Sequence, residues 1–266
     1  MKKKLLIIIP IAAAVIAAWL AFCGYQWSWG PFVKLHDVKT ASLEGNGEKY
    51  ALDNTPEKPD NPITGKTVIF LGSSVTYGSA SGGVSFADYI EKRDGCEMIK
   101  SAVSGTTLVE SGIDSYVSRL KKLDAEKADL LVCQLSTNDA SQKKELGKII
   151  ESKNLNDFDT KTVAGAIEYI ICYSKEKWNC PVIFYTNPRY DSELYGEMVD
   201  ILKEAEAKWG ISVIDMWNDA ELNAALNKNT ALYMADKIHP TKAGYLEIWT
   251  PFMEKTVFGV MKEEAK

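Results

Sequence analysis

Short apolar runs alternate with helix-length amphipathic segments throughout the chain after residue 66, and no other feature of the sequence restricts its fold as much. Such runs are typical of strands buried on both faces of a sheet. Strands that alternate with helices form βαβ units, so the sequence predicts an α/β fold of three layers, α/β/α, around a parallel sheet. The expected strands span 68–71, 97–99, 130–135, 182–185 and 213–214, and the expected helices 86–93, 111–123, 161–177, 193–209 and 241–261.

The N-terminal region follows a different pattern. Lys2, Lys3 and Lys4 precede an uncharged apolar run over 5–23, and a helix of that length can cross the hydrocarbon core of a bilayer. Lysines ahead of such a run favour the cytoplasmic side, which puts the rest of the chain outside the cell. We expect a single-pass signal anchor at the cell membrane. A cleaved signal peptide, which would leave a secreted protein, and a lipoprotein signal ending at Cys23 stay open as alternatives.

The remaining residues divide into a linker and one domain. Residues 24–62 begin with aromatic side chains and continue with polar and proline-rich sequence, which is typical of a stalk. About 200 residues follow, enough to bury a full α/β core. We therefore expect a signal anchor or signal peptide over 1–23, a linker over 24–62 and a globular domain over 63–266.

Charge and histidine content argue against two classes of function. The net charge of −5 provides no basic face to neutralise phosphates, so we expect no nucleic acid partner. The chain has two histidines, His36 and His239, and contains neither a CxxC pair nor an HExxH motif. We therefore expect no metal site and no cofactor.

The cysteines bear on the expected location outside the cell. Cys96, Cys133, Cys172 and Cys180 could form disulfides there. Cys172 and Cys180 could join the end of a helix to the next strand, whereas Cys133 lies in an apolar run and could be a small buried side chain. The sequence leaves the pairing open.

Polar residues follow three of the expected strands. Loops after the carboxyl ends of parallel strands meet at one edge of the sheet, where ligands bind. Ser74 follows the first strand, as either an exposed hydroxyl or a helix cap. Gly105 follows the second strand, where it permits close approach of a substrate or simply a turn. Asn138 follows the third, as either an N–H donor or an Asx-turn.

His239 is the candidate base. Imidazole is the side chain best suited to moving protons near neutral pH, and His239 lies in the segment Asp236-Lys-Ile-His-Pro-Thr. Asp236 is close enough, across one tight turn, to accept a hydrogen bond from one ring nitrogen. The other nitrogen would then face a nucleophile. A turn with a surface histidine is the alternative.

Together these segments resemble the four sequence blocks of the SGNH (GDSL-type) hydrolases. The blocks are GSSVT with Ser74, SAVSGTT with Gly105, STND with Asn138 and DKIHP with His239, in the family order over about residues 66–250. The resemblance implies a flavodoxin-like sandwich in which the first and third strands flank the site.

The resemblance also implies the roles of the residues. Ser74 is expected to be the nucleophile, His239 its base and Asp236 the carboxylate that orients the imidazole. The N–H groups of Ser74 and Gly105 and the side chain of Asn138 are expected to form the oxyanion hole.

Two positions depart from the common family pattern. Ser73 stands where these proteins usually have aspartate, and Ser136 stands where the third block usually has glycine. Neither departure removes a reacting group. Ser136 adds a side chain beside the expected oxyanion hole, so we expect it to contact substrate. Arg189 follows the fourth strand, where it could bind a polar substrate or form a surface salt bridge.

The sequence therefore predicts an extracytoplasmic serine esterase that acts through an acyl-serine intermediate. Short acyl groups, especially acetyl on carbohydrate, fit the expected location. A lysophospholipase or thioesterase is the alternative within the enzyme class. A catalytically silent glycan-binding domain on the same fold is the alternative outside it. The sequence gives no indication of oligomeric state.

Overall fold

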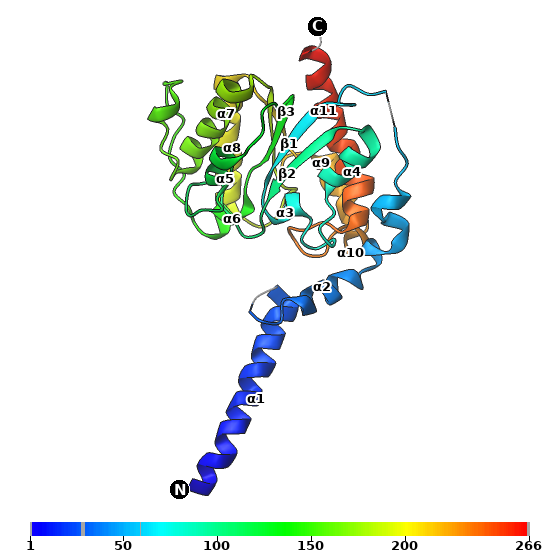
Figure 1. The fold of residues 1–266 in the computed structure, drawn as a ribbon, viewed down its shortest axis with the longest axis vertical. Helices are drawn as coiled ribbons and strands as arrows, with labels where there is room; N and C mark the ends of the chain where they lie inside the picture. Colours follow the sequence, from blue (N-terminus) through cyan, green and yellow to red (C-terminus); the bar gives the residue numbers. More distant parts are fainter. Residues whose placement is uncertain (1, 28–29, 59, 265–266) are drawn as a thin grey trace.

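The computed structural model describes residues 2–27, 30–58 and 60–264, and its central element is a five-stranded sheet (Figure 1). All strand pairs are parallel, which confirms the α/β fold with a parallel sheet. The strands are β1 (Thr67–Gly72), β2 (Glu97–Ala102), β3 (Leu130–Gln134), β4 (Val182–Tyr185) and β5 (Ser212–Ile214). Their order across the sheet is β2-β1-β3-β4-β5.

This strand order creates a switch point between β1 and β3. The chain passes from β1 outward to β2 and then returns to the other side of β1, so the loops after β1 and β3 diverge from adjacent strands. In doubly wound sheets a crevice forms where neighbouring connections leave in opposite directions. Candidate site residues in those two loops are therefore brought to one place.

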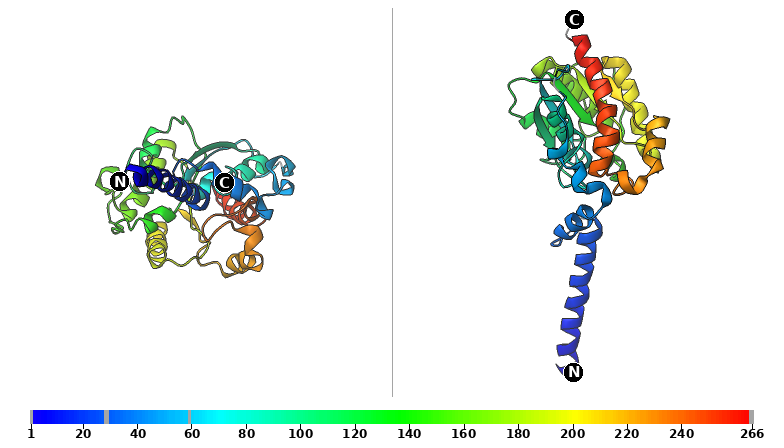
Figure 2. Two further views of the ribbon diagram at one scale, coloured as in Figure 1. Left: turned by 90° about the horizontal axis from the view of Figure 1, so that it is seen from below. Right: turned by 90° about the vertical axis from the view of Figure 1, so that its right-hand side faces the viewer.

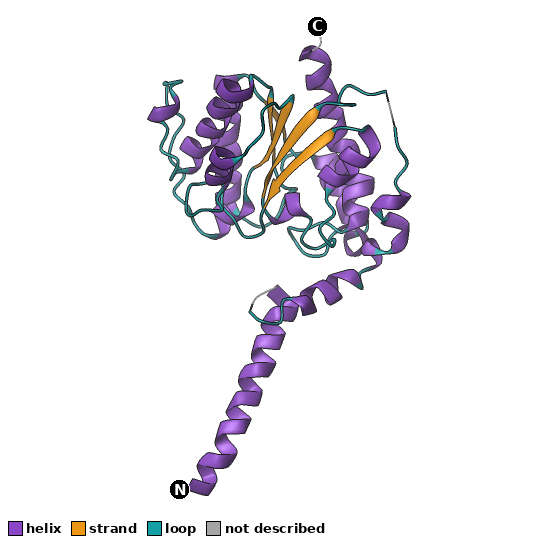
Figure 3. Ribbon diagram, in the orientation of Figure 1, coloured by secondary structure: helices purple, strands orange, loops and turns teal. Residues whose placement is uncertain are grey.

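Helices cover both faces of the sheet, as Figure 3 shows. Along β1, Ile69 and Leu71 pack on one face, and Val68 and Phe70 pack on the other. The first face is covered by α5 (Tyr116–Lys122), α7 (Val163–Trp178) and α8 (Glu193–Trp209). The second is covered by α4 (Phe86–Asp94), α9 (Ala220–Lys228), a π-helical turn η5 (Gly244–Trp249) and α11 (Thr250–Glu264).

Helix ends agree with the caps in the sequence. Ser85 caps α4 in a capping box with Asp88, and Ser192 caps α8, whose bounds match the predicted helix. The helix predicted over 111–123 is shorter in the structure. It is α5, which begins at Tyr116 because Ser115 is its N-cap. The helix predicted over 241–261 is divided into η5 and α11. The shorter helices are α3 (Ser74–Tyr77), α6 (Thr137–Ser141), α10 (Thr230–Tyr233) and the 3-10 turn η4 (Leu155–Asp157).

The N-terminal region consists of α1 (Lys2–Trp27) and α2 (Lys34–Ala41), which extend away from the sheet (Figures 1 and 2). Among the residues that the structure describes well enough to assess, no helix combines the length and apolarity needed to cross a membrane.

The predicted linker 24–62 contains segments that pack on the domain. Asn46 Nδ2 donates a hydrogen bond to the Ala80 carbonyl at 2.7 Å, and the Tyr89 hydroxyl donates to the Tyr50 carbonyl at 2.7 Å. Folded structure therefore begins upstream of residue 63. The contacts come from three 3-10 turns, η1 (Glu44–Asn46), η2 (Glu48–Tyr50) and η3 (Leu52–Asn54).

All five cysteines lie within the described residues, and all are buried free thiols. The Cys172 thiol points toward the Lys153 carbonyl, at 3.5 Å, and toward the Glu176 carboxylate, at 3.4 Å. The pairing of Cys172 with Cys180 that the sequence left open is therefore absent from the structure.

A buried acidic cluster joins α4 to α11 and makes stability depend on pH. Arg93 pairs with Glu254 at 2.7 Å, and the fully buried Asp94 lies beside them. Burial, together with the charge of Glu254, raises the pKa of Asp94 from 3.8 to about 7. Between these two values the folded state holds a proton that the unfolded state releases, so the contribution of Asp94 to stability declines as the pH rises from about 4 to 7.

We expect Asp94→Asn to raise the free energy of unfolding by about 1–4 kcal/mol at pH 8, because the amide cannot ionise. The gain should shrink as the pH falls toward 4. Urea unfolding at a series of pH values measures the difference, with the exposed Asp53→Asn as a control. A gain for Asp94→Asn that is independent of pH would contradict the assignment.

Candidate active site

Ser74 is the first residue of α3, two residues after the end of β1. The turn into α3 is so tight that a side chain at Gly72 would not fit. A β-carbon on Gly72 would lie 1.7 Å from Thr76 Oγ1 and 2.9 Å from Gln134 Oε1. Glycine therefore allows the strand to end directly against the first turn of α3, which places Ser74 at the carboxyl edge of the sheet.

A buried amide fixes the underside of this turn. Gln134 Oε1 accepts hydrogen bonds from the Ser73 N–H at 2.9 Å, from Ser73 Oγ at 3.3 Å and from Thr76 Oγ1 at 3.0 Å. Ser73, which stands where the resembling family usually has aspartate, is fully buried and points into this network. Its hydroxyl thus supports the turn from below.

The structure brings Ser74, His239 and Asp236 into one hydrogen-bonded chain. Ser74 Oγ lies 2.8 Å from His239 Nε2, and His239 Nδ1 lies 2.8 Å from Asp236 Oδ2. Asp236 Oδ1 also accepts the backbone N–H groups of Ile238 and His239 at 2.7 and 2.8 Å. Partial burial opposes ionisation of Asp236, but these bonds and the imidazole outweigh it and lower its pKa to about 2. The carboxylate is therefore ionised at neutral pH.

Hydrogen bonds to other segments hold the loop that carries His239 in place. Its backbone forms an antiparallel bridge between Met234 and Pro240, and Asn187 Nδ2 donates to the Ile238 carbonyl at 3.1 Å. The next turn is held by Asn46, whose Oδ1 accepts the Lys242 N–H at 2.8 Å. These contacts fix the imidazole opposite Ser74. A serine hydroxyl in that position can lose its proton to the ring as it attacks an electrophile.

Asn138 and Gly105 lie on neighbouring loops at the same edge. Asn138 Nδ2 donates to the Thr106 carbonyl at 2.9 Å, which leaves its second N–H available. Gly105 has φ of +80°, a left-handed conformation that favours glycine, and its carbonyl accepts a bond from Gln142 at 3.4 Å.

A buried carboxylate holds the loop after β2 in place. Asp139 is fully buried, and its oxygens accept the N–H groups of Leu108 at 2.7 Å and Val109 at 3.1 Å. Because Asp139 directly follows Asn138, this contact joins the loop of Gly105 to the loop of Asn138.

Two residues expected to contact substrate point elsewhere. Ser136 is fully buried, and its hydroxyl accepts the Asn138 N–H at 3.2 Å as the N-cap of α6. The guanidinium of Arg189 lies over the Trp217 ring, 5.0 Å from its centroid, and donates to Asn218 at 3.1 Å. Substrate contact by either residue stays a prediction, and the side chains as they stand support loops.

A cavity of about 380 Å³ opens beside Ser74 and His239. Several lining residues were not singled out from the sequence, because the rule that ligands bind at the carboxyl edge identifies loops and gives no side-chain directions. The sequence indicated only that the loop after β4 and the segment before His239 lie at this edge. The other lining residues are Thr137, Asn138, Ser141, Tyr190, Asp191, Ser192, Lys237 and Ile238.

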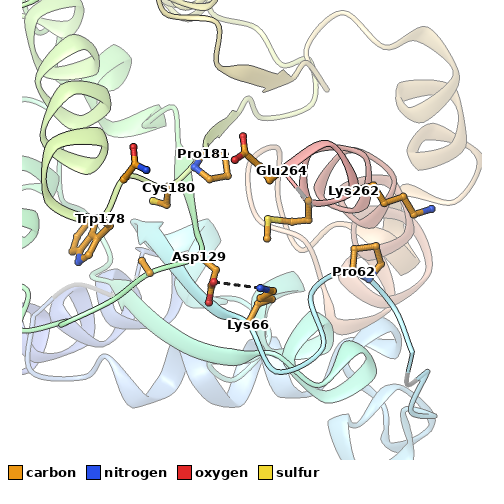
Figure 4. Close-up of a pocket in the computed structure, with 11 residues that line it drawn as sticks. Pro62, Lys66, Asp129, Trp178, Cys180, Pro181, Lys262 and Glu264 are labelled. Carbon is orange, nitrogen blue, oxygen red and sulfur yellow. Dashed lines mark ion pairs between the residues drawn. The ribbon is translucent and has the colours of Figure 1, made fainter. Parts of the chain in front are cut away.

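A larger hollow, of about 550 Å³, lies at the opposite edge of the sheet (Figure 4). Its residues lie ahead of β1, β3 and β4 or at the end of α11. The Asp129 carboxylate there already pairs with Lys66 at 3.5 Å and accepts the Thr67 N–H at 2.8 Å. We regard the smaller cavity as the candidate active site, because it contains the Ser74–His239 contact.

Comparison with known proteins identifies the family. Residues 70–246 match the GDSL-like Lipase/Acylhydrolase family. The chain belongs to this family. It is therefore a serine ester hydrolase, and the resemblance drawn from the four sequence blocks is confirmed. No curated protein matches the sequence.

Solved structures share the fold of this GDSL-like hydrolase. A putative GDSL-like lipase from Bacteroides uniformis is 18% identical, with a TM-score of 0.55, and the match covers 73% of this chain and 95% of that one. A putative GDSL-like lipase from Bacteroides ovatus is 17% identical, with a TM-score of 0.52 and coverage of 73% and 98%. The acetyl xylan esterase AlAXEase is 15% identical, with a TM-score of 0.50 and coverage of 72% and 99%.

Removal of the Asp139 carboxylate tests how the two loops are joined. We expect Asp139→Ala to lower the free energy of unfolding by about 2–4 kcal/mol, because two buried N–H groups lose their acceptor. Asp139→Asn keeps one carbonyl oxygen and should cost less. Urea unfolding of both variants measures the difference. Wild-type stability in the alanine variant would show that the loop after β2 is held by other contacts.

Proposed function

We propose that this GDSL-like hydrolase removes short acyl groups, acetyl above all, from carbohydrate, with Ser74 as its nucleophile. The observation that carries the proposal is the 2.8 Å contact between Ser74 Oγ and His239 Nε2, with Asp236 bound to the opposite ring nitrogen. This is the arrangement of a serine nucleophile, a base and an orienting carboxylate.

The reaction proceeds in two steps. Ser74 Oγ attacks the ester carbonyl while His239 takes its proton, and collapse of the tetrahedral intermediate expels the alcohol, which receives that proton. The acyl group is then an ester of Ser74. Water attacks this ester with His239 again as the base, and the acid leaves as Ser74 regains its proton. Asp236 keeps the imidazole in the required tautomer and stabilises the imidazolium.

Three N–H donors stabilise the oxyanion of each tetrahedral intermediate in this proposal. They are the backbone groups of Ser74 and Gly105 and the free N–H of Asn138. Hydrogen bonds that strengthen as charge develops on the oxygen lower the barrier rather than only binding the substrate.

The cavity is small and mainly apolar in its lining, which suits a short acyl group. Asp191, Ser192 and Lys237 are also among the lining residues, and their polar groups can hydrogen-bond sugar hydroxyls. The acetyl xylan esterase that shares the fold agrees with an acetylated carbohydrate as substrate. A lysophospholipase, which would take a long acyl chain, and a thioesterase are the alternatives within the enzyme class.

We also propose that the enzyme acts outside the cytoplasm, anchored by its N-terminal segment. The three lysines at the start of the chain and the uncharged run over 5–23 support this location. Cleavage of this segment would give a secreted enzyme of the same activity.

We expect Ser74→Ala to abolish hydrolysis of p-nitrophenyl acetate, because no other side chain in the cavity is paired with His239. A fluorophosphonate probe should label the wild type and leave the variant unlabelled. Full activity in Ser74→Ala would overturn the assignment, and an inactive, unlabelled wild type would favour a silent glycan-binding domain.

The same assay identifies the acyl group. Turnover of wild type should be highest with acetyl esters, including acetylated oligosaccharides, and should decline as the acyl chain lengthens. Turnover restricted to long-chain lipids would reject the carbohydrate proposal and favour a lysophospholipase.

We expect Asn138→Ala to reduce kcat on p-nitrophenyl acetate by about 10²–10³, the usual effect of losing one oxyanion donor. KM should change little, because the donor acts mainly in the transition state. Asn138→Asp keeps the size of the side chain but removes both N–H donors, so it should be at least as impaired. Wild-type kcat in Asn138→Asp would exclude the side chain from the oxyanion hole.

A further inference from the structure

Exposed apolar side chains on the folded domain gather at the active-site edge. Within the described part of the chain after residue 43, four large apolar side chains are exposed, and three of them follow β1 or β2. These are Tyr77, Val103 and Ile113, whose exposed fractions are 45%, 39% and 73%. The fourth, Ile150 at 38%, lies in the segment between α6 and α7. Scattered exposed apolar residues are ordinary, but a group around a catalytic edge indicates a contact surface.

The position of Ile113 follows from the topology. It lies three residues before α5, and α5 starts at the carboxyl edge because it returns the chain toward the amino end of β3. Val103 directly follows β2, and Tyr77 ends α3, the helix that Ser74 begins. Val103 and Ile113 therefore lie in the same loop as Gly105, and Tyr77 lies at the other end of the short helix that Ser74 begins.

The N-terminal helices leave the domain from the same edge. Asn46, just after α2, bonds to the Ala80 carbonyl and the Lys242 N–H, which belong to the segments that follow Ser74 and His239. Figures 1 and 2 show α1 extending from the side of the domain where α3, α6 and α10 lie. The apolar group on the domain and the apolar N-terminal segment thus lie on one side of the molecule.

The N-terminal helices add their own apolar surface. In α1, Ile11, Val15 and Ile16 are 57–63% exposed, and in α2 the Val38 side chain is 67% exposed. Exposed apolar side chains on a helix without charges favour contact with an apolar surface.

We propose that the active-site edge lies against a phospholipid bilayer, with α1 inserted into it and Tyr77, Val103 and Ile113 at its surface. The substrate is then an acyl ester carried close to that surface, such as an acetylated glycan on a lipid. The proposal rests on the proposed esterase activity and on the proposed N-terminal anchor, and it adds the orientation of the site and the setting of its substrate.

A bilayer fits these surfaces better than a second copy of the chain. A copy seated on the catalytic edge would cover Ile113 but would leave the exposed side chains of α1 in water, since α1 runs away from the domain. Three lysines precede the uncharged run, and lysines in that position suit lipid headgroups on the far side of a bilayer.

The test places the full chain in phosphatidylcholine vesicles and compares Ile113→Asp with Ile150→Asp, which adds the same charge at another exposed isoleucine. Turnover of an acetylated glycolipid in the vesicles should fall roughly tenfold or more in Ile113→Asp, since burying one such side chain changes binding by at least that factor. Hydrolysis of soluble p-nitrophenyl acetate should be unchanged in both variants. Equal turnover of the glycolipid by the two variants would overturn the proposal.

A second measurement is independent of activity. Ile113→Cys and Ile150→Cys can be labelled with an environment-sensitive fluorophore, because the five native thiols are at most 6% exposed. Emission from position 113 should shift to the blue on addition of vesicles, and emission from position 150 should not. A shift at neither position, or a shift at 113 caused by dimerisation without lipid, would reject the bilayer contact. Loss of soluble-ester hydrolysis in the wild type would instead reject the proposed function.

Discussion

The pairing of β1 with β3 is the contact on which the rest of the site depends. Four residue pairs, from Val68–Leu130 to Leu71–Cys133, hold the two strands in parallel register, so both end at the same edge. Ser74 and Asn138 come to one place because they follow these two ends. His239 arrives by a long return of the chain, and its position has to be fixed by separate contacts. The proposed catalytic group is thus a consequence of the sheet topology and of the contacts that hold the loop of His239.

The sequence predicts the centre of the sheet well, because β1, β3 and β4 are buried and appear as apolar runs. The edge strands β2 and β5 are only partly buried, and β2 extends three residues beyond its predicted end. The bounds of β4 agree with the prediction, and α8 matches residue for residue, since Ser192 and Gly210 cap its ends. Short helices such as α3 and α6 could not be predicted, because four or five residues contain too little of a helical period. The 3-10 turns between Glu44 and Asn54 could not be predicted either, since they have no regular apolar pattern.

At the candidate site, short motifs were sufficient to predict the proposed reacting residues. They were insufficient to predict the side chains that support them. Ser74, Asp236 and His239 meet because the loops that carry them end at one edge, which sequence order and topology indicate. Ser136 points inward because it caps α6, and Arg189 lies over the Trp217 ring. Neither contact can be predicted from the linear sequence. The buried polar groups Gln134 and Asp139 were missed for a related reason. Their role comes from the backbone N–H groups that the fold places beside them, at sites where an unpaired donor would be costly.

The attachment of Asn46 has a practical consequence for anyone who wishes to isolate the hydrolase. Its amide connects the chain after Ser74 with the chain after His239, although it lies outside the region of family similarity. A truncated protein that started at the first strand would keep every proposed reacting group and lose these two hydrogen bonds of Asn46. A fragment that keeps both hydrogen bonds of Asn46 has to begin ahead of Glu44. Between that point and the first strand, the segment predicted as a linker is a structural part of the domain.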